Sequence, residues 1–150
     1  MISLSNIGDV ILTFPVLDIL RTDFPKAEMS VVVGPKAESL LKDNPCFKNI
    51  FVFDKHQSFL KTIHFVGQLR AQRYDLIVDL RNTAIPFFAG GRYRTSFMDH
   101  KKNSLHMRLK HLNRLRTIYP YLAAAQEKYS LFIPEKDRIY IDQLLESEMS

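Results

Sequence analysis

The chain has 150 residues, of which 46% are hydrophobic and 25% charged, so its composition is that of an ordinary globular domain. Its single cysteine excludes an intramolecular disulfide and a multi-cysteine metal site, and no apolar run reaches the roughly 18 residues of a membrane span. The formal net charge of +5 favours acidic partners such as phosphates, anionic lipid or nucleic acid without choosing among them. Because the amino terminus has no secretory signature, we expect one cytoplasmic domain.

The first predicted helix runs from about Asp9 to Thr22, where apolar residues recur at helical spacing. Pro15 lies inside this pattern and predicts either a kink or a regular helix that starts near Thr13. Later helices are predicted at Lys36–Lys42, Phe59–Gln72, Thr83–Ala89, His106–Tyr119 and from Glu135 to about Glu146. Strands are predicted at Ser30–Val33, Asn49–Phe53, Asp75–Asp79, Tyr93–Phe97 and Ser130–Ile133.

This alternation is typical of βαβ units, so the fold class predicted is α/β, with a Rossmann-like parallel sheet flanked by helices. The strands are continuously apolar because a parallel sheet is covered on both faces. In such sheets ligands bind at the carboxyl ends of the strands. The first loop at that edge is Ser5–Asp9, which we therefore take as the candidate site.

Within this loop Gly8 would let the backbone turn tightly, while Ser5 and Asn6 can bond a ligand or the free amides of the next helix. Asp9 has two interpretations of similar weight: a residue that caps the helix, or a base that takes a proton from a substrate hydroxyl. The loop has one glycine and no Gly-Lys-Ser/Thr sequence, which disfavours a nicotinamide dehydrogenase or an NTPase.

Further candidates follow the Asp75–Asp79 strand and the Gly90–Gly91 pair. Arg81 and Asn82 lie at the same predicted edge as Asp9, and Asp79 is equally suited to capping the next helix. Arg92, Arg94 and Lys101 are suited to acidic sugars or phosphates, although a basic run is often only a solvated surface. The five histidines show no metal-ligand spacing, so no metal site is expected.

The run Leu4–Val16, read LSNIGDVILTFPV, resembles the opening of glycosyltransferase family 9, the heptosyltransferases of lipopolysaccharide inner-core assembly. Three later segments are similar to the family in order and spacing: Val33–Ala37, Arg73–Arg81 and Pro134–Arg138. The resemblance therefore covers nearly the whole chain.

The resemblance implies a GT-B fold of two Rossmann-like domains, of which residues 1–150 would be the N-terminal, acceptor-binding one. It also implies inverting, metal-independent transfer of heptose, with Asp9 as the catalytic base. Ser5, Asn6, Gly8, Arg81, Asn82, Arg92, Arg94 and Lys101 would then bind the acceptor, an anionic lipid-linked saccharide. The implied place of action is the cytoplasmic face of the inner membrane, with peripheral contact. No cofactor is expected, because ADP-heptose or a similar sugar donor would bind the C-terminal domain.

Two departures from the family limit what is expected of these residues. The first strand looks clipped to Ile2–Leu4, and the donor-binding C-terminal domain is absent from the sequence. Holding two reactants in register contributes up to roughly 7–11 kcal/mol to a transfer reaction, so the chain alone should be inactive. The rival interpretation is a non-catalytic Rossmann-like module that binds phosphate-rich ligands or nucleic acid. Nucleic acid is not expected, because aromatic and basic residues are not interleaved.

Overall fold

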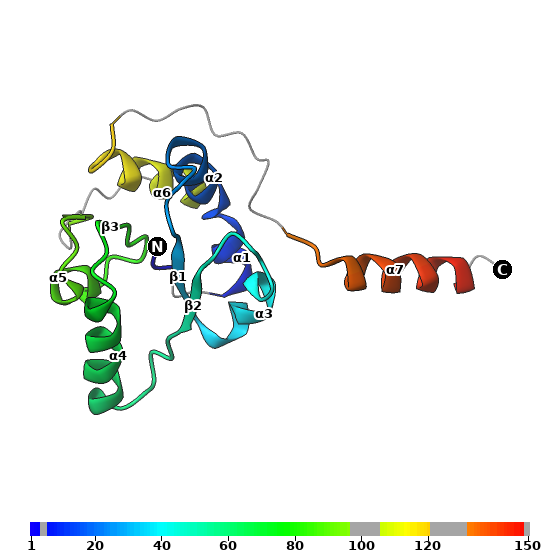
Figure 1. Ribbon diagram of the computed structural model, residues 1–150, viewed down its shortest axis with the longest axis horizontal. Helices are drawn as coiled ribbons and strands as arrows, with labels where there is room; N and C mark the ends of the chain where they lie inside the picture. The colour runs from blue at the N-terminus through cyan, green and yellow to red at the C-terminus, as the bar shows by residue number, and fades with distance from the viewer. Residues whose placement is uncertain (4–5, 97–105, 121–131, 149–150) are drawn as a thin grey trace.

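The computed structural model describes residues 1–3, 6–96, 106–120 and 132–148, and its centre is a parallel sheet. The strands are β1 (Ser30–Val33), β2 (Asn49–Val52), β3 (Leu76–Ile77) and β4 (Tyr93–Arg94). β1 pairs with β2 and β3 pairs with β4, both in parallel. Ile2 forms parallel bridges to Val32 and to Asp79, so the spatial order is β2, β1, Ile2, β3, β4. Figure 1 shows β1, β2 and β3 near the amino terminus.

The middle of the sheet is its thinnest part. The Ile2 backbone donates to Val78 O at 2.8 Å on one side, and the Ser3 backbone donates to Val32 O at 2.9 Å on the other. Residues 1–3 therefore join the β1–β2 half of the sheet to the β3–β4 half, and they are the only residues described before Asn6. The expected short first strand is present, although Leu4 lies outside the described residues.

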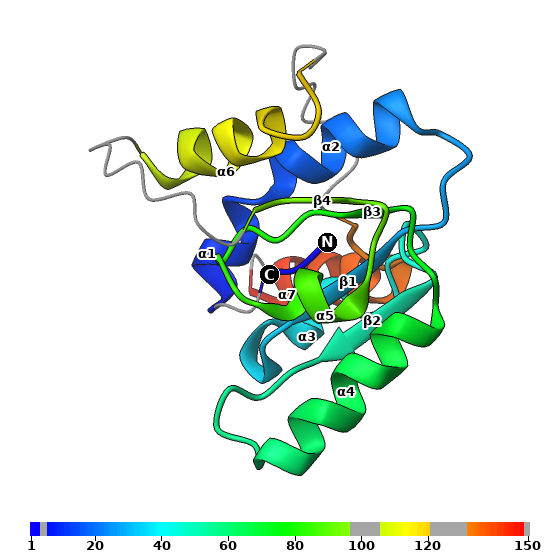
Figure 2. The ribbon, with the colours of Figure 1, turned by 90° about the vertical axis from the view of Figure 1, so that its left-hand side faces the viewer.

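Helices cover both faces of the sheet, as predicted for an α/β fold. They are α1 (Ile7–Ile11), α2 (Phe14–Asp23), the 3₁₀ turn η1 (Pro35–Ala37), α3 (Glu38–Leu41), α4 (Phe59–Ala71), α5 (Ile85–Ala89), α6 (Met107–Arg116) and α7 (Glu135–Glu148). On one face Phe65 and Leu69 of α4 pack with Ile77 and Ile85. On the other, Leu20 of α2 and Leu115 of α6 pack with the β3 side of the sheet (Figure 2).

The break predicted near Pro15 is confirmed. The chain leaves α1 at Leu12, and a new helix begins at Phe14 with Pro15 in its first turn. Proline is tolerated there because the first N–H groups of a helix have no partner within it. The Thr13 hydroxyl donates to Val10 O at 2.6 Å and ties the two helices together.

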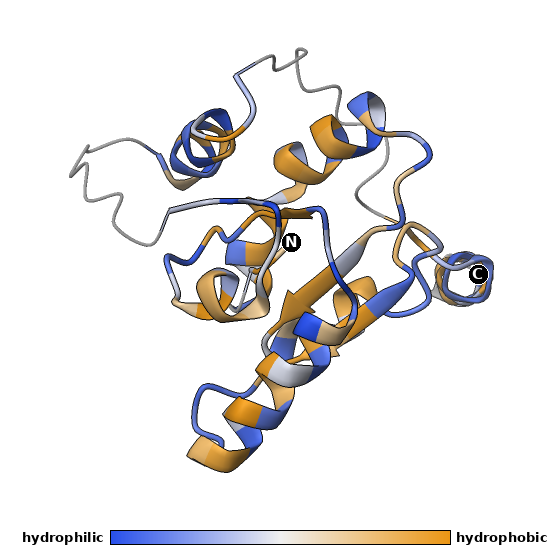
Figure 3. Ribbon diagram, turned by 60° about the vertical axis from the view of Figure 1, so that its left-hand side comes forward, coloured by the Kyte–Doolittle hydropathy of each residue, from blue (hydrophilic) through white to orange (hydrophobic). Residues whose placement is uncertain are grey.

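Other elements differ in detail from the prediction. The helix expected at Lys36–Lys42 is split into η1 and α3. In α4 the expected apolar face is buried only toward its carboxyl end: Leu69 is 3% exposed, whereas Leu60 is 77% and Ile63 54% exposed. Figure 3 shows this hydrophobic first turn of α4 beyond the edge of the sheet. Strand β3 covers Leu76–Ile77 rather than Asp75–Asp79, with Asp79 joined to Ile2 by a single bridge.

The end of the chain departs most from the prediction. Phe132 and Ile133 are not in a strand, and Ser130 and Leu131 lie outside the described residues. The predicted last helix is present as α7, which stands apart from the other elements (Figure 1). Its Lys136 pairs with Asp43 at 3.1 Å. None of the helices in the described ranges is long and apolar enough to cross a membrane.

Candidate functional site

Two loops meet at the carboxyl edge of the sheet, as the topology of parallel strands requires. Asn6 and Asp9 follow the first strand, and Arg81 and Asn82 follow β3. Arg81 Nη1 lies 3.5 Å from Asp9 Oδ2, although the residues are 72 positions apart. The prediction that these loops share one edge is therefore confirmed. Ser5 lies outside the described residues.

The start of α1 leaves the Asp9 carboxylate available for contacts outside its own helix. Asn6 is the N-cap residue, with extended backbone and no side-chain capping bond. Asp9 is the third helical residue, and its side chain, 38% exposed, faces Arg81. A carboxylate in a first helical turn also interacts favourably with the helix dipole.

Gly8 has a different role from the one predicted. It lies inside α1 without a positive φ, so no tight turn requires a glycine there. A Cβ built on Gly8 would meet nothing within 4 Å. Its lack of a side chain instead leaves open space one residue before Asp9, at the exposed helix start.

Asp79 organises the second loop from a fully buried position. Its Oδ1 accepts a hydrogen bond from the Arg81 backbone at 2.8 Å. Its Oδ2 accepts from the Thr83 backbone at 2.5 Å and from the Thr83 hydroxyl at 2.8 Å. These bonds lie just before α5, so the capping interpretation of Asp79 accounts for its contacts. They also fix the backbone from which Arg81 reaches Asp9.

Arg114 of α6 is a residue that the sequence did not single out. Its guanidinium donates to Asp79 O, to Asn82 Oδ1 at 3.0 Å and to Ser96 O at 2.8 Å. Asn82 itself has a left-handed backbone, with φ of 58°. Arg114 thus ties together the ends of β3 and β4 and occupies the amide oxygen of a predicted acceptor-binding residue. The only feature of the sequence that pointed to Arg114 was its position in a basic, amphipathic helix.

His111, one turn before Arg114, is the second residue that sequence reasoning missed. It is 2% exposed, and its Nε2 has no hydrogen-bond partner among the described residues. Burial lowers the pKa of His111, the positive charges of Arg81 and Arg114 lower it further, and Asp9 opposes them. The imidazole is therefore neutral at pH 7. A neutral, buried ring thus lies within electrostatic reach of the Asp9–Arg81 pair.

The remaining basic candidates make contacts away from Asp9. The Arg92 guanidinium lies over the Tyr93 ring at 5.5 Å, and that of Arg94 lies over Phe87 at 5.6 Å. Arg94 also donates to Gly91 O at 3.3 Å, which directs it back toward the amino end of β4. Lys101 is outside the described residues, and acceptor contact by these three basic residues stays a prediction.

No group of three or more His, Cys, Asp or Glu side chains in the described part of the chain is placed to hold a metal ion.

Comparison with known proteins bears on this arrangement. No protein-family model matches the chain. An alignment of 78 positions, which covers 49% of the chain, is 30% identical to lipopolysaccharide heptosyltransferase 3 of Escherichia coli and covers 23% of that protein. The fold matches a glycosyl transferase family 9 structure from Veillonella parvula with a TM-score of 0.73 over 98% of this chain, at 20% identity. The chain resembles glycosyltransferase family 9.

Two further structures have the same fold. E. coli heptosyltransferase WaaC with ADP matches 87% of this chain, at 15% identity and a TM-score of 0.64. The same enzyme with ADP-2-deoxy-2-fluoro heptose matches 85%, at 14% identity and a TM-score of 0.62. The chain spans 48% of the Veillonella family 9 protein and 50% of each WaaC chain, so its fold matches about half of each of these structures.

Proposed function

We propose that the chain is the acceptor-binding half of a family 9 glycosyltransferase that acts in lipopolysaccharide biosynthesis. The similarity to heptosyltransferase 3 and the fold shared with WaaC support this assignment. The observation that carries it is the Asp9–Arg81 pair, held 3.5 Å apart at the carboxyl edge of the sheet. A partly exposed carboxylate beside an open helix start is suited to accepting a proton from a bound hydroxyl.

In the proposed reaction Asp9 takes the proton of an acceptor hydroxyl as that oxygen bonds to the anomeric carbon of heptose. The bond from this carbon to the phosphate oxygen breaks, and ADP leaves with the electron pair. Attack from the side opposite ADP inverts the anomeric centre, and no metal takes part. ADP-heptose would be held by a second domain that faces this edge.

Arg81 has a second task in this proposal. One of its N–H groups orients the Asp9 carboxylate. Its other N–H groups can turn toward the acceptor and bind a phosphate or carboxylate there. Asn6 and Asn82 lie in the same two loops and add polar groups for sugar hydroxyls. The acceptor we propose is an anionic lipid-linked saccharide, reached by peripheral contact at the cytoplasmic face of the inner membrane.

The decisive experiment joins the chain to the donor-binding half of a family 9 enzyme and measures heptose transfer from ADP-heptose. Asp9→Asn should abolish turnover while leaving acceptor binding and circular dichroism unchanged. Asp142→Asn, an exposed carboxylate change on α7, is the matched control and should leave turnover intact. Turnover retained by Asp9→Asn would remove Asp9 as the base.

Calorimetry on the chain by itself tests the acceptor-binding assignment separately. The isolated chain should bind the inner-core saccharide and show negligible transfer, because a transferase needs both reactants held together. Arg81→Ala should weaken this binding, whereas Arg70→Ala, on α4 away from the edge, should not. Failure of the isolated chain to bind the saccharide would contradict the assignment.

A further inference from the structure

Three large apolar side chains are exposed together at the start of α4. Phe59 and Leu60 are each 77% exposed, and Ile63 is 54% exposed. Residues three and four positions apart lie on the same side of a helix, so Ile63 lies beside both of the others. The core contacts of α4 come later along the helix, from Phe65 and Leu69. We call the three exposed residues 59, 60 and 63 the α4 tip.

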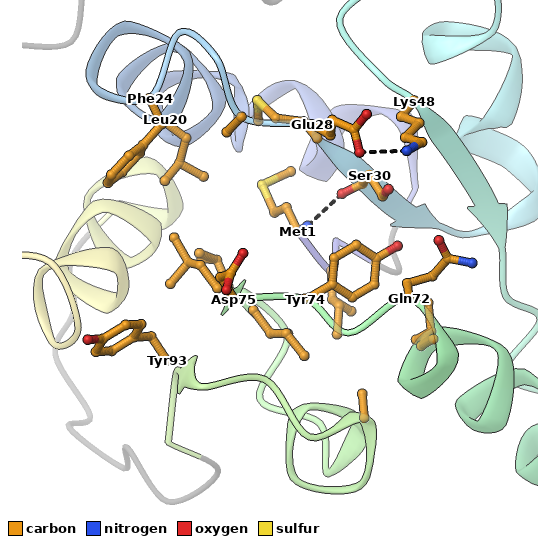
Figure 4. A pocket seen from close by; sticks show the side chains of 18 of the residues that line it. Met1, Leu20, Phe24, Glu28, Ser30, Lys48, Gln72, Tyr74, Asp75 and Tyr93 are labelled. Carbon is orange, nitrogen blue, oxygen red and sulfur yellow. Dashed lines mark hydrogen bonds and ion pairs between the residues drawn. The ribbon is translucent and has the colours of Figure 1, made fainter.

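Helix α4 runs from one edge of the sheet to the other. Its start follows the carboxyl end of β2, so the α4 tip lies at the same edge as Asp9 and projects beyond the sheet (Figure 3). The far end of α4 lies at the amino ends of the strands, where Gln72 lines a pocket together with Met1 and Ser30 (Figure 4). A contiguous apolar patch on a protein surface marks a site that contacts another protein or a membrane. The α4 tip is therefore a candidate contact surface beside the candidate site.

The charges around the α4 tip are positive. Between Asp54 and Asp75 the sequence contains no acidic residue, whereas it contains Lys55, Lys61 and two arginines. Both lysines are exposed, and neither forms an ion pair with a described residue. Lysines near the surface of a membrane are attracted by its anionic lipids. The surroundings of the α4 tip are thus complementary in charge to an anionic bilayer.

We propose that the α4 tip inserts into the surface of an anionic phospholipid bilayer, with Lys55 and Lys61 at the level of the headgroups. Helices with exposed apolar side chains and nearby lysines bind bilayers through both. The long stem of a lysine lets its ammonium group stay in water while neighbouring apolar side chains leave it. A second copy of the chain fits less well. In a two-fold dimer formed through the tip, each lysine would lie near the lysines of the other copy, and like charges repel.

This assignment deepens the peripheral membrane contact of the proposed function and rests on that function only for its purpose. A lipid-linked acceptor extends from the bilayer that holds its lipid. A bilayer bound at the carboxyl edge of the sheet would bring the saccharide to the loops that carry Asp9 and Arg81. Binding of a bilayer without acceptor requires neither the saccharide nor the transfer reaction, so it can be measured by itself.

The first test is flotation of the full chain with vesicles of phosphatidylethanolamine and phosphatidylglycerol. The chain should bind these vesicles more tightly than vesicles of phosphatidylcholine, by about fivefold for each lysine near the surface. Replacing all three residues of the α4 tip with Gln should weaken binding by roughly tenfold or more, because each apolar side chain gains free energy on leaving water. The matched control replaces Ile139, Ile141 and Leu144 of α7, which are 48%, 49% and 43% exposed, with Gln and should leave binding unchanged.

Three outcomes of this test would overturn the proposal. Equal binding by the tip variant and the control variant would show that the α4 tip does not contact the bilayer. A chain that dimerises through the tip in sedimentation and does not float with vesicles would assign the tip to a second copy. Vesicle binding that disappears once the chain is joined to a donor-binding half would assign the tip to that half.

A single tryptophan reports which part of the chain enters the bilayer, because the sequence contains none. The emission of Phe59→Trp should shift to shorter wavelength when the vesicles are added, and brominated lipid should quench it. Tyr140→Trp, at a 62% exposed position of α7, is the matched aromatic control and should show neither change. Equal responses at the two positions would overturn the proposal. Neither experiment contains ADP-heptose or an acceptor saccharide, so the transferase assignment is decided by its own experiments.

Discussion

Replacing Arg114 with methionine should loosen the loop that presents Arg81 to Asp9. The guanidinium donates to Asp79 O, Asn82 Oδ1 and Ser96 O, and methionine keeps much of its apolar stem while removing every donor. A hydrogen bond from a charged group contributes roughly 1.5–3 kcal/mol. Arg114 is only partly buried, so water replaces part of what is lost. We expect the free energy of unfolding to fall by about 2–4 kcal/mol.

Arg116→Met is the matched control on the same helix. Arg116 is exposed and donates to Asn113 Oδ1 at 3.4 Å, so its loss should change stability by less than about 0.5 kcal/mol. Urea unfolding followed by circular dichroism measures both variants, and the m-value checks that the unfolded surface is unchanged. If the two variants lose the same stability, the three hydrogen bonds of Arg114 do not stabilise the fold, and the loop after β3 is not held by them.

Three further predictions concern the sheet and its core. The chain should be about 2 kcal/mol less stable at pH 6 than at pH 8. The buried Met1 amino group has a pKa of about 5 in the folded state and 8.0 in the unfolded state, so the unfolded state binds more protons between these pH values. Acetylation of Met1 should reduce this slope, and the lowered pKa of His111 leaves a smaller one of the same sign below about pH 6.5. Gly91→Ala should destabilise by about 1–3 kcal/mol, since its Cβ would lie 2.7 Å from Ile77 Cγ1 and 2.8 Å from Ile77 Cδ1. Ile77→Val in the same chain removes Cδ1 and should restore part of the loss. Leu115→Ala should cost about 2–5 kcal/mol in thermal unfolding, whereas Leu109→Ala, at a 47% exposed position of the same helix, should cost far less.

The parts of the fold that were predictable are those determined by local pattern. The apolar runs at Ser30–Val33 and Asn49–Val52 form paired parallel strands. Residues 31–33 are buried, as expected for a strand covered on both faces, whereas no residue of β2 is fully buried. Pro15 could be placed at a helix start because its ring removes one N–H wherever it lies. Gly90 ends α5 with φ of 78°, as the Gly-Gly pair indicated.

The missed features depend on what the chain packs against. Leu60 and Ile63 continue the apolar spacing of α4, but the sheet ends before it reaches them, and periodicity carries no information about that edge. His111 looked like an ordinary polar position of α6, yet it is 2% exposed and lies near enough to Asp9, Arg81 and Arg114 for their charges to act on its pKa. The burial of His111 depends on how α6 docks at the ends of β3 and β4, where Arg114 bonds to Asp79 O and Ser96 O. Among the candidate residues, Asp9 and Arg81 could be brought together from sequence because parallel topology places the loops after the strands at one edge.

The short first strand links the two ends of the sheet. Asp9 and Arg81 are carried by loops on different strands, and their 3.5 Å separation depends on how Ile2 is held between Val32 and Asp79. An exposed ion pair contributes only about 0.2–1 kcal/mol, which is too little to fix that separation. The backbone bonds of Met1–Ser3 to both halves of the sheet must therefore do so.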